Sequence, residues 1–167
     1  NFYVNRSCGL HLHIDGAGII PASVRDQRAS PKILKNLMFF YYFFDDVIFS
    51  FLPASRRTNQ YCMPVNKNYS ESEIKNCKTF DDFEKLWYKE PNKDSRESRK
   101  RNKYDNSRYT GLNLHSLLKD GHLEVRYHSG TINGVKLLYW AYFNLFIIDN
   151  IVSGKITETK VRKIATD

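Results

Sequence analysis

Hydrophobic and polar residues alternate in two short stretches of the chain, residues 10–15 and residues 123–128. The polar positions are His11, His13 and Asp15 in the first stretch and Glu124, Arg126 and His128 in the second. Side chains of a strand point alternately to opposite faces, so both stretches predict strands with one apolar and one polar face. If both strands lie in one sheet with their apolar faces together, the polar side chains form a common floor.

Between these two strands the pattern becomes helical. Pro31 suits the first position of a helix and Ser30 its N-cap, so the aromatic run 32–52 predicts a buried helix that ends at Pro53. Its charged residues, and an uncharged part shorter than the roughly 20 residues that a bilayer requires, disfavour a membrane span. Acidic residues three positions after Ser70 and Thr79 predict capping boxes at the start of two short helices.

Besides the strand at residues 123–128, the second half of the chain predicts one loop, one further strand and two helices. Residues 91–104 are charged and poor in apolar side chains, which predicts a charged surface loop. Residues 108–114 return to a strand-like pattern. Residues 135–152 predict an amphipathic helix whose aromatic run 139–146 belongs to the core, and residues 157–167 begin another helix.

The order of strand, helix, short helices, strand, strand and helix predicts an α+β fold, with a mostly antiparallel sheet and helices packed on one face. Parallel winding is disfavoured because no glycine-rich phosphate loop opens a helix. The length of 167 residues suits a single domain, residues 1–167.

Composition narrows the possible partners and the compartment. The net charge of +8 favours an anionic partner, which leaves nucleic acid, a nucleotide and an acidic substrate open. The three cysteines, Cys8, Cys62 and Cys77, are odd in number and widely spaced, which argues against a disulfide framework and a CxxC zinc site. We therefore expect a reducing, cytoplasmic setting.

The polar floor offers metal ligands and anion-binding groups. Carboxylate ligands favour Mg²⁺ or Mn²⁺, and imidazole also tolerates Mn²⁺ and Zn²⁺, so His11, His13 and Glu124 suit a divalent cation. The arginines at positions 56, 57, 108 and 126 suit phosphate or carboxylate. A cation with several arginines indicates phosphoryl chemistry. Two simpler interpretations stay open: the histidines occupy a solvated strand face, and Glu124 and Arg126 form only a local ion pair.

Four ordered blocks of sequence point to a known family. They are residues 8–15 (CGLHLHID), residues 55–64 (SRRTNQYCMP), residues 108–114 (RYTGLNL) and residues 123–133 (LEVRYHSGTIN). Together they resemble the amidoligase family, a branch of the carboxylate–amine ligases with a glutamine-synthetase-like fold. The resemblance implies that residues 1–167 are part of such a catalytic domain. Family members usually begin with a strand carrying a Glu-x-Glu pair, for which residues 1–167 contain no clear substitute. The resemblance therefore implies either the catalytic portion of a longer ligase, inactive alone, or an inactive remnant.

The resemblance also implies roles for individual residues. They are metal ligands (His11 and Glu124), nucleotide contacts (His13, Arg108 and Arg126), catalytic groups (Arg126, Arg108 and Glu124) and substrate contacts (Arg56 or Arg57, Ser129 and Thr131). The implied reaction is ATP-dependent amide formation with Mg²⁺ or Mn²⁺. A carboxylate attacks the γ-phosphorus of ATP, and an amine then attacks the resulting acyl phosphate in a site that excludes water.

The expected partners are a small-molecule or peptide carboxylate and an amine, without nucleic acid or a membrane. Two alternative functions remain. A metal-dependent hydrolase or phosphotransferase would use His11, His13, Glu124 and His128. A non-enzymatic nucleic-acid-binding basic domain is motivated by the charge of +8 and by residues 93–103.

Overall fold

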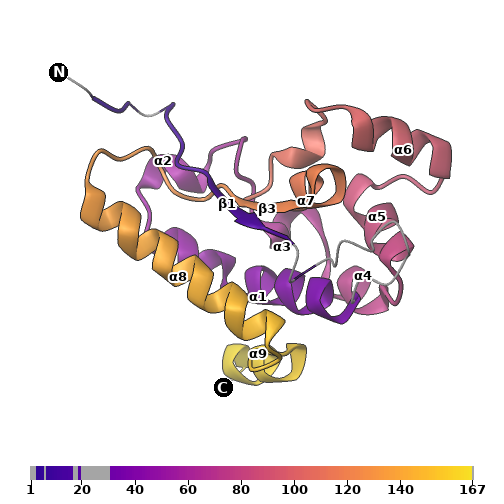
Figure 1. Cartoon of the computed structure of the whole chain (residues 1–167). Helices are drawn as coiled ribbons and strands as arrows, with labels where there is room; N and C mark the ends of the chain where they lie inside the picture. The colour runs from indigo at the N-terminus through magenta and orange to yellow at the C-terminus, as the bar shows by residue number, and fades with distance from the viewer. Residues whose placement is uncertain (1–2, 6, 17–18, 20–30, 167) are drawn as a thin grey trace.

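The sheet of this protein has three strands and lies at the centre of an α+β fold (Figure 1). The computed structural model describes residues 3–5, 7–16, 19 and 31–166. The strands β1 (Leu12–Asp15), β2 (Leu112–Asn113) and β3 (His122–Val125) run antiparallel in the order β1-β3-β2. The register places His13 and Asn113 opposite Glu124, one on each side. The prediction that the two patterned stretches share a sheet with their polar faces together is therefore confirmed.

Helices make up most of the described chain. They are α1 (Pro31–Ser50), α2 (Ala54–Arg57), α3 (Val65–Asn68), α4 (Glu71–Asn76), α5 (Phe80–Tyr88), α6 (Lys93–Arg101), the 3₁₀ helix η2 (Asn106–Arg108), α7 (Leu114–Asp120), α8 (Gly134–Val152) and α9 (Glu158–Thr166). In Figure 1, α1 lies below the sheet, α8 crosses the molecule at the lower left, and α6 and α7 lie at the upper right. Helix α7 also contacts β3, and its Ser116 reaches Glu124 on the polar face of the sheet. The prediction that the helices pack on only one face of the sheet is therefore wrong.

The apolar face of the sheet packs on α1. Leu123, Val125 and Tyr127 are fully buried. The ring of Tyr127 stacks on Tyr41 of α1 at 5.6 Å and meets the edge of Phe49 at 5.3 Å. Burying apolar area of this kind is the main favourable term in folding, so the contact fixes the position of β3 on α1.

Helix starts agree closely with the sequence. Both predicted capping boxes form: the side chains of Ser70 and Thr79 accept from the third backbone N–H of α4 and α5, and Glu73 and Asp82 accept from the cap residues. Helix α1 begins at Pro31 as predicted, and Ser30 lies outside the described residues.

The predicted charged loop at residues 91–104 is wrong, because residues 93–101 form α6. Asn92 caps this helix, and Arg96 is only 2% exposed. Its guanidinium pairs with Asp81 of α5 and donates to the carbonyl of Pro91 at 2.6 Å. Lys100 pairs with Glu84 at 2.8 Å. Helix α6 is attached to α5 by ion pairs and not by an apolar face. Local composition does not reveal such pairs, because the partners are far apart in the sequence.

The strand predicted at residues 108–114 is also shorter than expected. Only residues 112 and 113 pair with β3, and α7 follows at once. The side chain of Asn113 accepts from the backbone N–H of His115 and so starts the helix. Gly121, at φ 79°, ends it in the left-handed conformation that favours glycine.

Helix α8 departs from the expected core position of residues 139–146. One stripe of the helix faces the core, and the opposite side is apolar but exposed. Tyr139, Tyr142 and Phe146 are 73%, 66% and 65% exposed. Within the described residues, α8 is the one helix long and apolar enough to cross a membrane, which by itself is weak evidence because core helices pass the same test.

Candidate active site

Glu124 is the centre of a hydrogen-bonded cluster on the polar face of the sheet. Its Oε1 lies 2.9 Å from Nδ1 of His11, 2.7 Å from Nη1 of Arg126 and 3.7 Å from Nε2 of His13. One ligand atom from each of His11, His13 and Glu124 lies within 4.8 Å of the others. The three residues predicted to hold a cation therefore do converge.

Two residues that sequence reasoning did not assign orient the carboxylate. Nδ2 of Asn113 donates to Oε2 of Glu124 at 2.5 Å, and Oγ of Ser116 donates to the same oxygen at 3.1 Å. Asn113 follows the predicted strand pattern and lies in one of the four blocks, which was the available signal. Ser116 lies on α7, and nothing in its local sequence indicates this contact. Together the two side chains leave Oε1 directed toward His11 and His13.

The electrostatics of the cluster favour an ionised carboxylate. Burial raises the pKa of Glu124, but the hydrogen bonds from His11 and Asn113 and the charge of Arg126 outweigh it, so the pKa lies well below its ordinary value. Burial lowers the pKa of His13. At neutral pH this ring is therefore neutral and has a lone pair to offer to a cation.

A cavity of about 300 Å³ opens beside the cluster and is lined by His11, His13 and Glu124. Three cationic side chains, Lys103, Arg108 and Lys119, line it as well, and Lys119 pairs at 2.5 Å with Asp120, which is also in the lining. The fold thus brings the predicted Arg108 to the same cavity as the predicted metal ligands. The charges of Lys103 and Arg108 at this cavity favour an anion such as a phosphate chain.

Arg126 lies at the back of the cluster. It is 4% exposed, and its Nε donates to the carbonyl of Tyr61 at 3.2 Å. Its guanidinium also lies over the ring of Tyr109, 6.0 Å from the centroid. These contacts fix the guanidinium next to Glu124, so its charge is available to the cluster without large movement.

The two predicted substrate arginines have different surroundings. Arg56 is 3% exposed and donates from Nε to the carbonyl of Tyr127 at 2.8 Å and from Nη2 to that of Arg126 at 2.6 Å. It therefore supports the backbone that carries Arg126. Arg57 is exposed and donates to the carbonyl of Phe49 at 3.3 Å. A direct contact of either residue with substrate stays a prediction.

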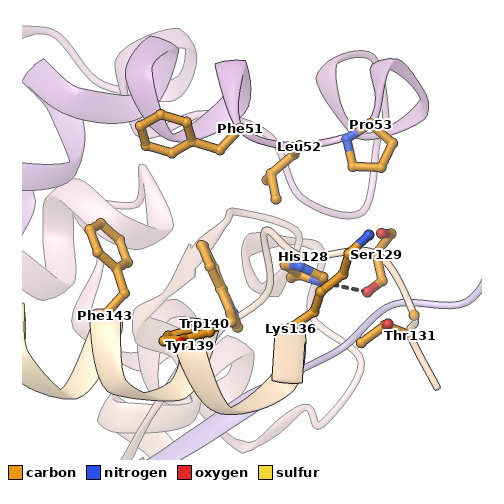
Figure 2. Close-up of a pocket in the computed structure, with 11 residues that line it drawn as sticks. Phe51, Leu52, Pro53, His128, Ser129, Thr131, Lys136, Tyr139, Trp140 and Phe143 are labelled. Atoms are coloured by element: carbon orange, nitrogen blue, oxygen red, sulfur yellow. Dashed lines mark hydrogen bonds between the residues drawn. The ribbon is translucent and has the colours of Figure 1, made fainter. Parts of the chain in front are cut away.

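The other predicted substrate residues, Ser129 and Thr131, line a second cavity together with His128 (Figure 2). No described residue lines both cavities. The ring of His128 lies 5.2 Å from that of Trp140. The structure therefore does not bring these three residues into the Glu124 cluster.

The cluster fits a divalent cation. Two ligands of one ion, each at about 2.1 Å, lie at most about 4.2 Å apart, slightly less than the 4.8 Å span here. The side chain of His13 is 53% exposed, so a small rotation closes the difference. Two imidazoles and one carboxylate suit Mn²⁺ or Zn²⁺ as well as Mg²⁺. Arg126 would share the carboxylate with the ion.

The fold and the cluster define an α+β protein with a candidate cation and phosphate site on the polar face of its sheet. The chain belongs to the family described as "Putative amidoligase enzyme", whose model matches residues 1–148. No curated protein and no solved structure gives a significant match to the chain. Membership of this family confirms the resemblance seen in the sequence and indicates a ligase.

Proposed function

We propose that the protein joins a carboxylic acid to an amine at the expense of ATP, through an acyl phosphate, on a glutamine-synthetase-like scaffold. The observation that carries this proposal is the convergence of His11, His13 and Glu124 with Arg108 around one cation-lined cavity, in a chain of the amidoligase family. Each group suits a triphosphate with its divalent cation.

In this proposal His11 and Glu124, with His13 beside them, hold Mg²⁺ or Mn²⁺. The bound ion supplies positive charge to the phosphate oxygens. Arg108 neutralises the nucleotide phosphates from the rim of the cavity, and Arg126, behind Glu124, adds its positive charge near the transferred phosphoryl group. Fixed cations of this kind stabilise the charge that spreads over the phosphoryl oxygens in the transition state.

The reaction then takes two steps. A carboxylate oxygen of the acid attacks the γ-phosphorus, the bond to the β-phosphate oxygen breaks, and ADP leaves. The amine nitrogen attacks the acyl carbon of the resulting acyl phosphate, inorganic phosphate leaves, and the nitrogen loses a proton. ATP is required because a free carboxylate is a poor electrophile at neutral pH. We also propose a cytoplasmic location, supported by three free cysteines.

The geometry gives less support to the two alternatives. The hydrolase would use His128 together with the Glu124 cluster, and His128 instead packs on Trp140 beside the second cavity. The nucleic-acid-binding domain relied on the charges of residues 93–103. Arg96 and Lys100 in this segment are paired with acidic residues of α5, which lowers the charge available to a polyanion.

Calorimetry of ATP binding, with and without Mg²⁺, tests the proposal. We expect Mg²⁺-dependent binding by the wild type and a loss of about tenfold in Glu124→Gln, which keeps the shape of the side chain but removes its charge and replaces one acceptor oxygen with an amide donor. Asp149→Asn, which removes one exposed charge from α8, is the matched control and should bind as the wild type. His13→Asn is a second variant at a half-exposed position, where folding is not at risk. Equal affinities of the wild type and both site variants would refute the proposal.

A further inference from the structure

The second cavity has a volume of about 570 Å³ and lies between the end of α1, the turn at residues 128–131 and the first turns of α8. Its two ends differ in chemistry. Figure 2 shows Phe51 and Phe143 at one end and Ser129, Thr131 and Lys136 at the other. A cavity of this volume is in the range of small-molecule sites.

The apolar end is an aromatic wall. The rings of Trp140 and Phe143 stack at 5.8 Å, and Trp140 is 7% exposed, so this part of the wall is firmly packed. Phe51 and Tyr139 are 69% and 73% exposed at the mouth of the cavity. A flat or extended apolar body placed against them would remove this apolar area from water.

The polar end carries the positive charge of the Lys136 ammonium. Within the described part of the chain, no acidic side chain lies within ion-pair distance of the Lys136 ammonium. Lys136 lies in the first turn of α8, where the helix dipole adds to its charge. Nδ1 of His128 donates to the carbonyl of Ser129 at 2.6 Å, which fixes this ring at the same end. The polar end therefore favours an anion over an amine.

The polar end also adjoins the Glu124 cluster through the backbone. The N–H of Leu10 donates to the carbonyl of His128 at 3.0 Å, and the N–H of Gly130 donates to that of Cys8 at 2.7 Å. His11 is the next residue after Leu10, and Arg126 precedes His128 by two positions, about 7 Å along an extended chain. These bonds place the turn that lines the polar end beside the chain segments that carry His11 and Arg126.

We propose that this cavity binds the acid substrate, and that this acid is a carboxylate with an aromatic or extended apolar body. The body lies against Trp140 and Phe143, and the carboxylate lies at Lys136. The role of the acid as substrate rests on the proposed ligase function. Its binding to the cavity does not, because it requires no nucleotide.

The test uses three probes without nucleotide: 4-phenylbutyrate, its uncharged amide and acetate. Affinities come from calorimetry, and the site comes from the indole ¹⁵N–¹H signals of the two tryptophans, Trp87 and Trp140, in NMR spectra. We expect 4-phenylbutyrate to bind more tightly than both other probes and to shift the signal of Trp140 rather than that of Trp87. In Lys136→Gln the preference for the acid over the amide should fall about fivefold, as for a partly exposed ion pair.

Lys155→Gln, which removes an exposed lysine just after α8, is the matched control and should keep the preference. Equal binding of acid and amide by the wild type would overturn the proposal. An unchanged preference in Lys136→Gln, or no shift of Trp140, would also overturn it. Lys136 is exposed, so folding of the variant is not at risk.

The outer face of α8 is apolar and exposed, so a second copy of the chain could instead cover the mouth of the cavity. Sedimentation at the concentrations used for calorimetry separates the two. A dimer at these concentrations that binds no acid would assign the cavity mouth to the dimer and refute the proposal. Mg²⁺–ATP binding without acid binding would refute this inference and leave the ligase proposal standing, and acid binding without Mg²⁺–ATP binding would do the reverse.

Discussion

Replacing Asp45 by asparagine should flatten the dependence of folding stability on pH. Asp45 lies on α1 and is fully buried beneath the sheet. Its Oδ1 accepts from the hydroxyl of Tyr127 at 2.5 Å, and its Oδ2 accepts from the backbone N–H of Asn66 at 3.1 Å. Burial raises the pKa of Asp45 from 3.8 to about 7, because these hydrogen bonds only partly offset the loss of hydration.

The sign of the effect follows from the two protonation states. Between pH 3.8 and about 7 the folded protein retains a proton on Asp45 that the unfolded chain has released. The contribution of Asp45 to the free energy of unfolding is therefore largest at acid pH and falls as the pH rises through 7. The difference between the two pKa values corresponds to about 4 kcal/mol, at about 1.36 kcal/mol per pKa unit. About 3 kcal/mol of this is lost between about pH 5 and pH 8, since the unfolded chain is already ionised at pH 5.

Urea denaturation at pH 5 and pH 8 measures this change. The wild type should lose about 3 kcal/mol more between these two values than Asp45→Asn. The comparison cancels the contribution of the histidines, which titrate in the same range in both proteins. Asp46→Asn, at the exposed neighbouring position, is the matched control and should keep the pH dependence of the wild type. The same pH dependence in Asp45→Asn and the wild type would refute the reasoning.

Three further substitutions test how the site is supported, each by urea denaturation at pH 7. Gly111→Ala would place a Cβ 2.3 Å from the packed ring of Tyr127, so we expect a loss of about 1–3 kcal/mol, and a loss near zero would contradict that packing. Arg56→Met would leave two buried carbonyls without donors and should cost about 2–4 kcal/mol, whereas the exposed Arg57→Met should cost much less. Ser70→Ala removes the cap of α4 and should cost about 1 kcal/mol, and Ser70→Asp should retain most of the stability.

Much of the candidate site was predictable from local pattern. The alternation around Glu124 and around His13 defines a polar face on each strand, and antiparallel pairing of the two apolar faces then brings these residues opposite each other. Asn113 and Ser116 were not assigned, because their role depends on how α7 turns back on β3 after only two paired residues. The division of the polar residues between two cavities was not predictable either, since His128, Ser129 and Thr131 continue the same stretch of sequence.

The sequence by itself determined the elements whose signals are local: the two patterned strands, the helix that starts at Pro31 and both capping boxes. Periodicity and caps involve neighbours in the chain, so they can be read without the fold. Only the tertiary structure decided the rest. Helix α6 depends on ion pairs with α5, which a charged sequence does not reveal. In α8, residues of similar hydrophobicity lie on both sides, and tertiary packing, including that against α1, selects which side is buried and which stays exposed beside the second cavity.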